Sequence, residues 1–144
     1  MDDLSYIACH ACGTKNRLPS SRLGDKPRCG KCKIPLFSGR PIDITDANFS
    51  DIVEYTSIPV VVDFWAPWCG PCKMMKPVFE QAAAALEPRV RFTAVNTESE
   101  QSTAARYGIT AIPTVILFKN GREIARQAGA MDYSSLVQWI NSSR

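Results

Sequence analysis

Apolar and polar positions follow changing patterns after residue 41, and each pattern predicts a secondary-structure element. Residues 42–44 alternate apolar, polar and apolar, which predicts a short strand. Thr45 or Asp46 can then cap a helix whose apolar residues share one face. These residues are Phe49, Ile52 and Val53. Residues 59–65 are almost continuously apolar, a pattern typical of a central strand covered on both faces.

A long amphipathic helix is predicted after this strand. Its apolar residues recur at intervals of three and four, as one face of a helix requires. They are Met75, Val78, Phe79, Ala82, Ala83 and Leu86. Pro77 falls within this stretch and predicts a kink, because proline lacks the N–H that a helix interior uses.

The remaining patterns complete an α/β fold. Residues 90–96 predict a strand, and residues 100–107 predict a short helix that Gly108 ends. Asn120-Gly121 interrupts a strand-like run over 115–126 and predicts a tight hairpin. The closing amphipathic helix carries Tyr133, Leu136, Val137 and Ile140. This order of elements predicts a mixed central sheet with helices on both faces.

Residues 5–37 contain only scattered apolar side chains, too few to hold a fold by burial alone. Cysteines offer another way to hold it, because Cys9/Cys12 and Cys29/Cys32 form two Cys-x-x-Cys pairs with sixteen residues between them. This spacing is typical of a tetrahedral zinc site with four thiolate ligands. We therefore predict one structural Zn²⁺ per chain, whose binding free energy folds the segment. The alternatives are two disulfides or a redox-regulated set of dithiols.

Other residues of this segment fit the zinc prediction. Gly13 and Gly30 each follow a cysteine and suit turns that bend the backbone around a metal. His10 lies between the first two cysteines and is a conceivable replacement ligand. Four cysteines leave it no coordination position, so we expect His10 to be a surface residue.

Charge separates the chain into two parts. Residues 1–40 hold eight Lys and Arg against three acids, or +5, whereas the rest holds nine against eleven, or −2, giving +3 overall. With residues 38–41 as a linker, we predict a small zinc-ribbon-like finger at 1–40 and a second domain at 41–144. The basic runs of the finger contain no aromatic residues, so we expect a solvated basic face and no nucleic-acid partner.

A third pair, Cys69 and Cys72, lies between the apolar strand and the long helix and has no second pair left to share a metal. Its place predicts a redox-active dithiol. The helix N-terminus stabilises a thiolate at Cys69, and Cys72 lies one turn further on, where it can attack a mixed disulfide. Pro71 costs the helix little stability, because an N–H at this position near the helix start would have no intrahelical acceptor. The alternative is a zinc knuckle or a pair of buried structural thiols.

The sequence around this pair resembles the thioredoxin family. The resemblance rests on Phe64-Trp65-Ala66-Pro67-Trp68-Cys69-Gly70-Pro71-Cys72-Lys73, on Ile112-Pro113-Thr114 and on Phe118-Lys119-Asn120-Gly121, and it covers residues 41–144. The added N-terminal cysteine pairs make the chain most similar to the bacterial zinc-finger thioredoxins. This resemblance implies a thioredoxin fold after the finger, and a protein-disulfide reductase that cycles between dithiol and disulfide.

Asp63 interrupts the apolar strand six residues before Cys69. Burial would raise the pKa of its carboxyl group and make it a plausible proton acceptor for Cys72, although a hydrogen-bonded structural aspartate is an equal alternative. The resemblance implies the role of base. A lysine that often neighbours this aspartate in the family is replaced by Ala94, which changes what tunes Asp63.

The resemblance also implies a substrate-binding surface. It implies a cis bond before Pro113, facing the cysteines, and a backbone at Ile112 that pairs with an extended substrate segment. Trp65 is expected to pack in the core. The expected substrate-binding residues are Trp68, Gly70, Pro71, Ile112, Gly129 and Ala130.

The sequence and the family resemblance also indicate partners and a cellular location. No Gly-x-Gly motif occurs, so no dinucleotide site is indicated, and the family implies that thioredoxin reductase supplies the electrons to disulfide-containing protein substrates. The first residues lack the features of a signal peptide and no run is long enough to span a membrane, which favours the cytoplasm and no membrane partner. The alternative functions are a disulfide oxidase or isomerase, or a zinc-ribbon binding module with a thioredoxin-like adaptor.

Overall fold

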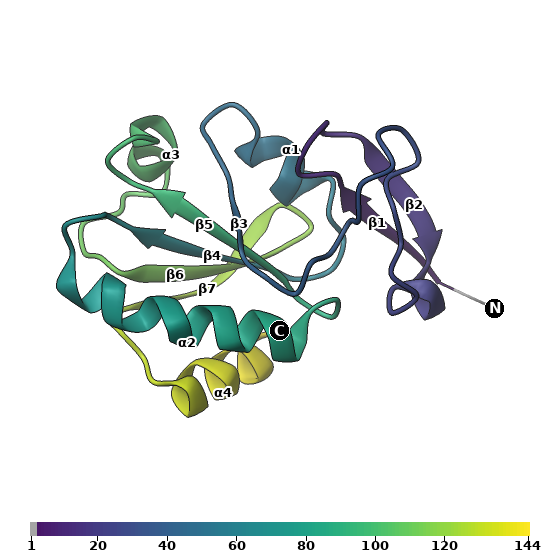
Figure 1. Ribbon diagram of the computed structural model, residues 1–144. Helices are drawn as coiled ribbons and strands as arrows, with labels where there is room; N and C mark the ends of the chain where they lie inside the picture. Colours follow the sequence, from purple (N-terminus) through teal and green to yellow (C-terminus); the bar gives the residue numbers. More distant parts are fainter. Residues whose placement is uncertain (1–2) are drawn as a thin grey trace.

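A five-stranded sheet in the order β3-β5-β4-β6-β7 forms the centre of the computed structural model, which describes residues 3–144 (Figure 1). Its strands are β3 (Ile42–Asp43), β4 (Val60–Trp65), β5 (Arg91–Asn96), β6 (Thr114–Lys119) and β7 (Arg122–Ala128). Strands β3, β5 and β4 run parallel, whereas β6 runs antiparallel to β4 and β7 antiparallel to β6. The predicted mixed sheet is confirmed.

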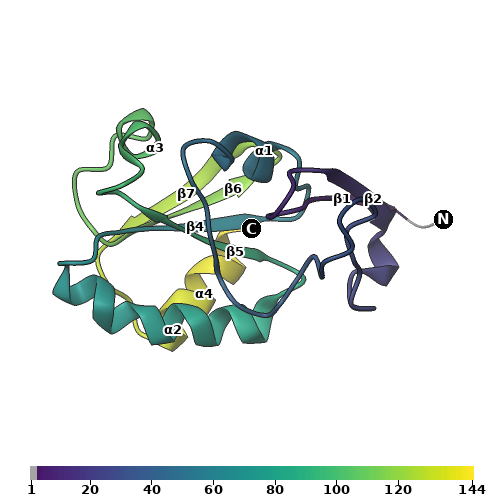
Figure 2. The ribbon, with the colours of Figure 1, turned by 45° about the horizontal axis from the view of Figure 1, so that its top comes forward.

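Helices cover both faces of this sheet, as Figures 1 and 2 show. They are α1 (Phe49–Glu54), α2 (Gly70–Leu86), α3 (Gln101–Arg106) and α4 (Tyr133–Ser143). Helices α2 and α4 lie on one face, and α1 and α3 lie on the other. Helix α2 is continuous through Pro77. Among residues 3–144, no helix has the length and apolar character needed to cross a membrane.

Alternate residues of the central strand β4 point to the two faces and join two apolar clusters. Val61 packs with the residues of α2 and α4, and Val62 and Phe64 pack with those of α1. Because side chains of a strand alternate, Asp63 shares the α2 face with Val61. The sequence pattern of residues 59–65 therefore places one carboxyl group beneath the long helix.

Local hydrogen bonds decide how the short elements begin and end. The N-cap of α1 is Asn48, and not Thr45 or Asp46 as predicted. Thr45 bonds this residue reciprocally, since the Asn48 N–H donates to Thr45 Oγ1 (3.3 Å) and the Thr45 N–H donates to Asn48 Oδ1 (2.7 Å). Asp46, the other candidate cap, instead accepts from the Thr103 N–H of α3 (2.8 Å). In the hairpin, Asn120 and Gly121 both have positive φ, 53° and 78°, as a type I′ turn requires.

The finger is a two-stranded unit at one end of the sheet (Figure 1). Strands β1 (Leu4–Ala8) and β2 (Lys15–Pro19) pair antiparallel, and the short 3₁₀ helix η1 (Ser20–Arg22) follows. Residues 1–2 of the predicted finger lie outside the described residues. Its small core consists of Ile7, Cys9, Cys29 and Leu36, completed by Ile58 from the segment that leads into β4.

The finger is hydrogen-bonded to the rest of the molecule. The Ser57 N–H donates to Tyr6 O (2.8 Å), and the Tyr6 N–H donates to Ser57 Oγ (2.9 Å). The Ala8 N–H donates to the buried Thr56 Oγ1 (3.2 Å). The finger is therefore fixed at the end of the sheet where β4 begins, whereas α2 starts where β4 ends.

Candidate redox and metal sites

A disulfide between Cys69 and Cys72 lies at the start of α2, with a Cα–Cα distance of 5.2 Å. Cys69 is the N-cap residue of this helix, and its Sγ accepts a hydrogen bond from the Cys72 N–H (3.2 Å). An N–H group without an intrahelical acceptor thus points at the sulfur, which favours a negative charge there. The geometry suits a Cys69 thiolate in the reduced protein.

Some of the expected substrate-binding residues surround this disulfide. The Ile112–Pro113 bond is cis, as the resemblance implies, and Ile112 O lies 3.8 Å from Cys69 Sγ. The Gly129 N–H donates to Pro113 O (2.8 Å), which brings the loop with Ala130 to the same end of the sheet. Trp68 is 68% exposed beside Cys69. The chain thus presents an apolar surface next to the two sulfurs.

The exposed start of α2 extends this surface. Gly70 and Pro71 form its first turn and are both exposed. Met74 is 74% exposed, the highest value among the large hydrophobic residues of the described chain. Sequence reasoning did not single out Met74. Met74 does not belong to the apolar face that begins at Met75. An apolar residue outside that face is expected to be exposed, and this is the signal by which the sequence could have identified it.

Asp63 is buried beneath α2, with 5% of its surface exposed. Burial raises the pKa of its carboxyl group from about 3.8 to about 7. Its Oδ1 has no hydrogen-bond partner among residues 3–144. On β5, the residue paired with Asp63 is Ala94, which brings no charge to the carboxyl group. Desolvation by burial is therefore the cause of the raised pKa.

Asp63 and Cys72 line one cavity of about 520 Å³. The cavity lies between α2, the sheet and the segment that enters β3. Its other lining residues are Arg40, Pro41, Asp43, Trp65, Pro67, Lys73, Lys76, Phe79, Glu80 and Ala94. Trp65 is half-buried there and packs against the cluster that holds the disulfide, as expected of a packing residue. The lining thus combines the basic residues Arg40, Lys73 and Lys76 with the acidic residues Asp43 and Glu80, a grouping that the sequence did not reveal.

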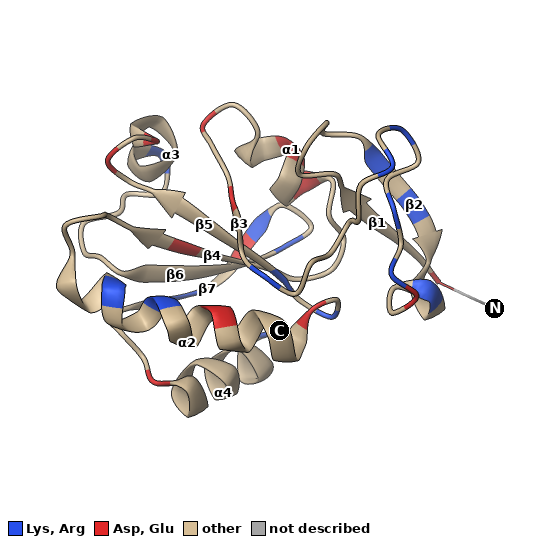
Figure 3. Ribbon diagram, viewed as in Figure 1, with Lys and Arg blue, Asp and Glu red and all other residues tan. Residues whose placement is uncertain are grey.

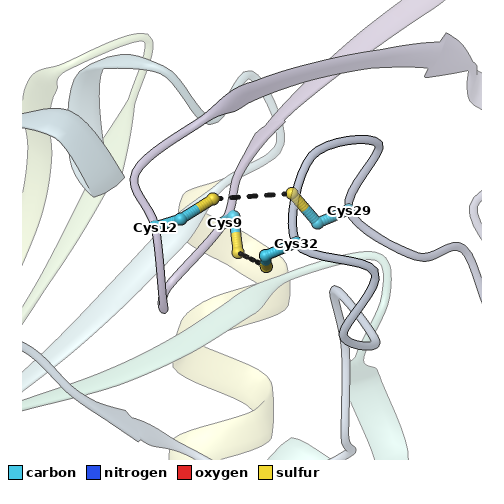
Figure 4. Close-up of side chains that lie close together, drawn as sticks. All are labelled: Cys9, Cys12, Cys29 and Cys32. Atoms are coloured by element: carbon cyan, nitrogen blue, oxygen red, sulfur yellow. Dashed lines mark hydrogen bonds between the residues drawn. The ribbon is translucent and has the colours of Figure 1, made fainter.

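The four N-terminal cysteines form a second site, in which the two Cys-x-x-Cys pairs face each other (Figure 4). Cys9 and Cys32 Sγ are 3.5 Å apart, Cys12 and Cys29 Sγ are 3.6 Å apart, and all four sulfurs lie within 4.8 Å of one another. Zn–S bonds of about 2.3 Å place tetrahedral sulfurs about 3.8 Å apart. The four thiols therefore suit one tetrahedral metal ion.

Backbone turns shape both halves of the metal site. The Gly13 N–H donates to Cys9 O (2.9 Å), and the Lys33 N–H donates to Cys29 O (3.0 Å). Gly13 has φ +76°, as its predicted turn role requires, but the equivalent position in the second turn is Lys33 with φ +69°. Gly30 does not adopt positive φ, and its N–H bonds Asn16 Oδ1 (2.9 Å).

His10 is not the surface residue that the sequence predicts. It is half-buried, and its Nδ1 lies 3.2 Å from Arg91 Nη2, at the start of β5. Burial, together with the Arg91 charge, lowers the pKa of the imidazole. The neutral ring therefore accepts a hydrogen bond from the guanidinium. Sequence reasoning missed this contact, because 81 positions separate the two residues.

Basic residues gather on the finger, as Figure 3 shows. The Lys15 ammonium lies over the rings of Tyr6 (4.7 Å) and Tyr55 (5.5 Å). One basic side chain of the finger is therefore engaged in cation–π contacts within the protein.

Comparisons with known proteins match both parts of the chain. The family model described as Thioredoxin matches residues 40–142, and the model described as Thioredoxin 2, N-terminal matches residues 8–33. Thioredoxin C-3 of Corynebacterium nephridii is 40% identical over 135 residues, which cover 94% of this chain and 92% of the relative. Thioredoxin of Haemophilus influenzae is 42% identical over 69% of this chain and 94% of the relative. Thioredoxin 1 of Synechococcus elongatus is 43% identical over 68% of this chain and 92% of the relative.

Proposed function

Because the chain belongs to the thioredoxin family, we propose that it is a protein-disulfide reductase that cycles between a Cys69/Cys72 dithiol and a disulfide. Family membership and the disulfide at Cys69 and Cys72 make the chain a thiol–disulfide oxidoreductase. The proposal concerns the direction of the reaction and the residues that carry it. The observation that supports it most is the position of Cys69, at a helix N-terminus beside the cis bond of Pro113.

In the proposed reaction, the Cys69 thiolate attacks a disulfide of the substrate protein. A bond forms between Cys69 and one substrate sulfur, the substrate disulfide breaks, and the other substrate sulfur leaves as a thiolate. Cys72 then loses its proton and attacks Cys69 Sγ. The Cys69–Cys72 bond forms, and the second substrate thiolate leaves. The two electrons of the dithiol thus pass to the substrate.

Asp63 accepts the proton of Cys72 in this scheme. Both residues line the same cavity, and the raised pKa of Asp63, about 7, suits a base that must both accept and release a proton near neutral pH. The absence of a hydrogen-bond partner for Oδ1 within residues 3–144 leaves that oxygen available to the thiol or to water. A structural aspartate would instead be expected to have its oxygens bonded.

The proposed substrate surface takes an extended polypeptide across the disulfide. The backbone of Ile112 offers hydrogen bonds to it, and the cis bond of Pro113 sets the direction of that backbone. Apolar contact comes from the exposed surface around the two sulfurs. Its proposed residues are Trp68, Gly70, Pro71, Gly129 and Ala130.

The finger, in this proposal, comprises residues 1–40 with its linker and holds one structural Zn²⁺ through Cys9, Cys12, Cys29 and Cys32. The redox domain comprises residues 41–144. Cysteines that bind a metal must stay reduced, and we propose that the chain works in the cytoplasm, where thiols are kept reduced. Thioredoxin reductase is the proposed electron donor.

A coupled assay tests the proposal. The full chain, with thioredoxin reductase and NADPH, should reduce the disulfides of insulin, and NADPH consumption should depend on this chain. The matched control is the double variant Cys69→Ser/Cys72→Ser, which keeps the finger and removes the redox pair. Equal NADPH consumption with wild type and this variant would contradict the proposal and favour the alternative function of a binding adaptor.

A further inference from the structure

Arg91 is among the largest side chains that the described fold buries completely, with 1% of its surface exposed. It occupies the first position of β5, where its own N–H bonds Pro59 O (2.8 Å). Burying a guanidinium costs several kcal/mol unless charge and hydrogen bonds compensate. The contacts of this side chain therefore show which interactions compensate for the cost of burying it.

Its partners come from the finger. Nη1 donates to Leu36 O, and Nη2 lies 3.2 Å from His10 Nδ1. The guanidinium also lies 5.0 Å from the centroid of the Phe37 ring. One side chain of the redox domain thus contacts the finger at three residues.

Two of these contacts lie on the two halves of the metal site. His10 is inside the first Cys-x-x-Cys turn, between Cys9 and Cys12. Leu36 follows the second turn and shares the small core of the finger with Cys9 and Cys29. The guanidinium therefore bridges the segments that carry the two pairs of ligands, and a change in the separation of those segments would break one of its bonds.

The charge of Arg91 has no direct carboxylate partner among residues 3–144. The two ion pairs in that part of the chain involve Arg22 and Arg126 instead. Its Nε has no hydrogen-bond partner there either. The Glu87 carboxylate acts on the Arg91 charge without an ion pair, and its oxygens accept from the N–H groups of Gly39 (3.2 Å) and Phe92 (3.0 Å).

We propose that Arg91 is the outer-shell residue of the four-cysteine metal site, supplied by the redox domain. Four thiolates around a divalent ion would carry a net charge of about −2, and a buried guanidinium bonded to both ligand segments would offset part of it. The guanidinium also bridges the two segments that carry the ligand pairs. Metal retention by the finger therefore depends on a residue at the start of β5. The same strand carries Ala94, which pairs with Asp63 on β4.

Zinc release from the purified full chain tests this proposal. Arg91→Gln keeps polar atoms for Leu36 and His10 but removes the charge, whereas Arg91→Lys keeps the charge. Zinc release to a chromogenic chelator should be about 10–100-fold faster in Arg91→Gln, because loss of an outer-shell partner typically lowers metal affinity by about that factor and the lower affinity should appear as faster release. Arg91→Lys should fall between Arg91→Gln and wild type. Arg89→Met is the matched control, because Arg89 is exposed two residues away and its side chain bonds only Ala85 O in the described chain (3.2 Å).

A second variant separates this role from docking of the finger. Thr56→Val removes the hydrogen bond that Thr56 Oγ1 accepts from the Ala8 N–H, a docking contact of β1 that does not involve Arg91. It should release zinc more slowly than Arg91→Gln. Equal acceleration by Thr56→Val and Arg91→Gln would show that docking alone controls metal retention and would overturn the proposal. Release from Arg91→Gln at the wild-type rate would overturn it as well. Neither readout depends on disulfide reduction, so failure here leaves the proposed function untouched.

Discussion

The same Cys-x-x-Cys spacing occurs three times in this chain and takes two different structures. In the finger, Cys9/Cys12 and Cys29/Cys32 lie in tight backbone turns, and their four sulfurs meet within 4.8 Å. At the start of α2, Cys69 and Cys72 form a single pair joined by a disulfide. The backbone around each pair, and whether a second pair faces it, determine the chemistry. Spacing alone does not distinguish a metal ligand set from a redox pair.

The two regions also differ in what holds them together. The sheet of the redox domain has an apolar cluster on each face. The finger has one small cluster of five buried residues, which include the candidate metal ligands Cys9 and Cys29 as well as Ile58 from the redox domain. Loss of metal should therefore unfold the finger and leave the sheet folded.

The largest expected effect comes from removing one finger ligand. Cys29→Ser should reduce bound zinc from about one per chain to none and disorder the β1–β2 hairpin, because apparent binding free energies of structural zinc are about 10–16 kcal/mol. Elemental analysis and two-dimensional NMR of protein purified with zinc and a reductant measure both effects. Cys69→Ser/Cys72→Ser removes the third pair and should keep its zinc. Zinc loss from both proteins would abolish the distinction between the two kinds of pair.

Trapping experiments sharpen the contrast within the redox pair. Cys72→Ser should lose turnover and accumulate mixed disulfides with substrate proteins, because no thiol remains to displace the substrate from Cys69. Non-reducing gel electrophoresis and mass spectrometry identify the trapped species. Cys69→Ser is the control and should trap far less. If Cys69→Ser trapped more substrate than Cys72→Ser, the two roles would have to be exchanged.

Asp63→Asn tests the buried carboxyl group. Disulfide reduction should slow most near neutral pH and less at high pH, by up to about 10²–10⁴-fold where proton removal from Cys72 limits the rate. Measured rates between pH 6 and pH 9 provide the test, and an unchanged pH profile would remove Asp63 from the reaction.

The same variant should be more stable than wild type above mildly acidic pH. The carboxyl group titrates near pH 3.9 in the unfolded chain but near pH 7 in the folded chain, so the folded state binds the proton more tightly. The stability from the neutral carboxyl is complete below the unfolded pKa and is lost as pH rises through the folded pKa, by about 4 kcal/mol in total. Denaturant midpoints of the two proteins should therefore diverge from pH 4 to pH 7. Parallel curves would mean that Asp63 is solvated or paired.

Ala94→Lys is expected to have the smallest effect, and it tests what tunes Asp63. An ammonium placed in the cavity should lower the pKa of Asp63 by about one pH unit or more, because an opposite charge at short range favours the carboxylate. Ala94→Met adds similar bulk without charge and is the matched control. NMR titration of the Asp63 carboxyl carbon reports the pKa directly. An equal change in both variants would show that bulk, and not charge, controls it.

The sequence predicted the order of elements because hydrophobic periodicity reflects burial along one chain segment. It also predicted the grouping of the four finger cysteines, since ligand spacing is a local property. It missed the contacts that docking creates. His10 meets Arg91, and Ala8 meets Thr56, only because the finger folds against the end of the sheet. The exposure of Met74 and the positive φ of Lys33 likewise depend on the folded backbone.

Controlled oxidation of the reduced, zinc-loaded chain tests most directly whether one spacing serves two chemistries. One equivalent of a two-electron oxidant should form one disulfide, which mass spectrometry should map to Cys69 and Cys72, while about one zinc per chain stays bound. A disulfide among Cys9, Cys12, Cys29 and Cys32, with release of zinc at that first equivalent, would contradict the assignment of redox chemistry to α2 and metal binding to the finger.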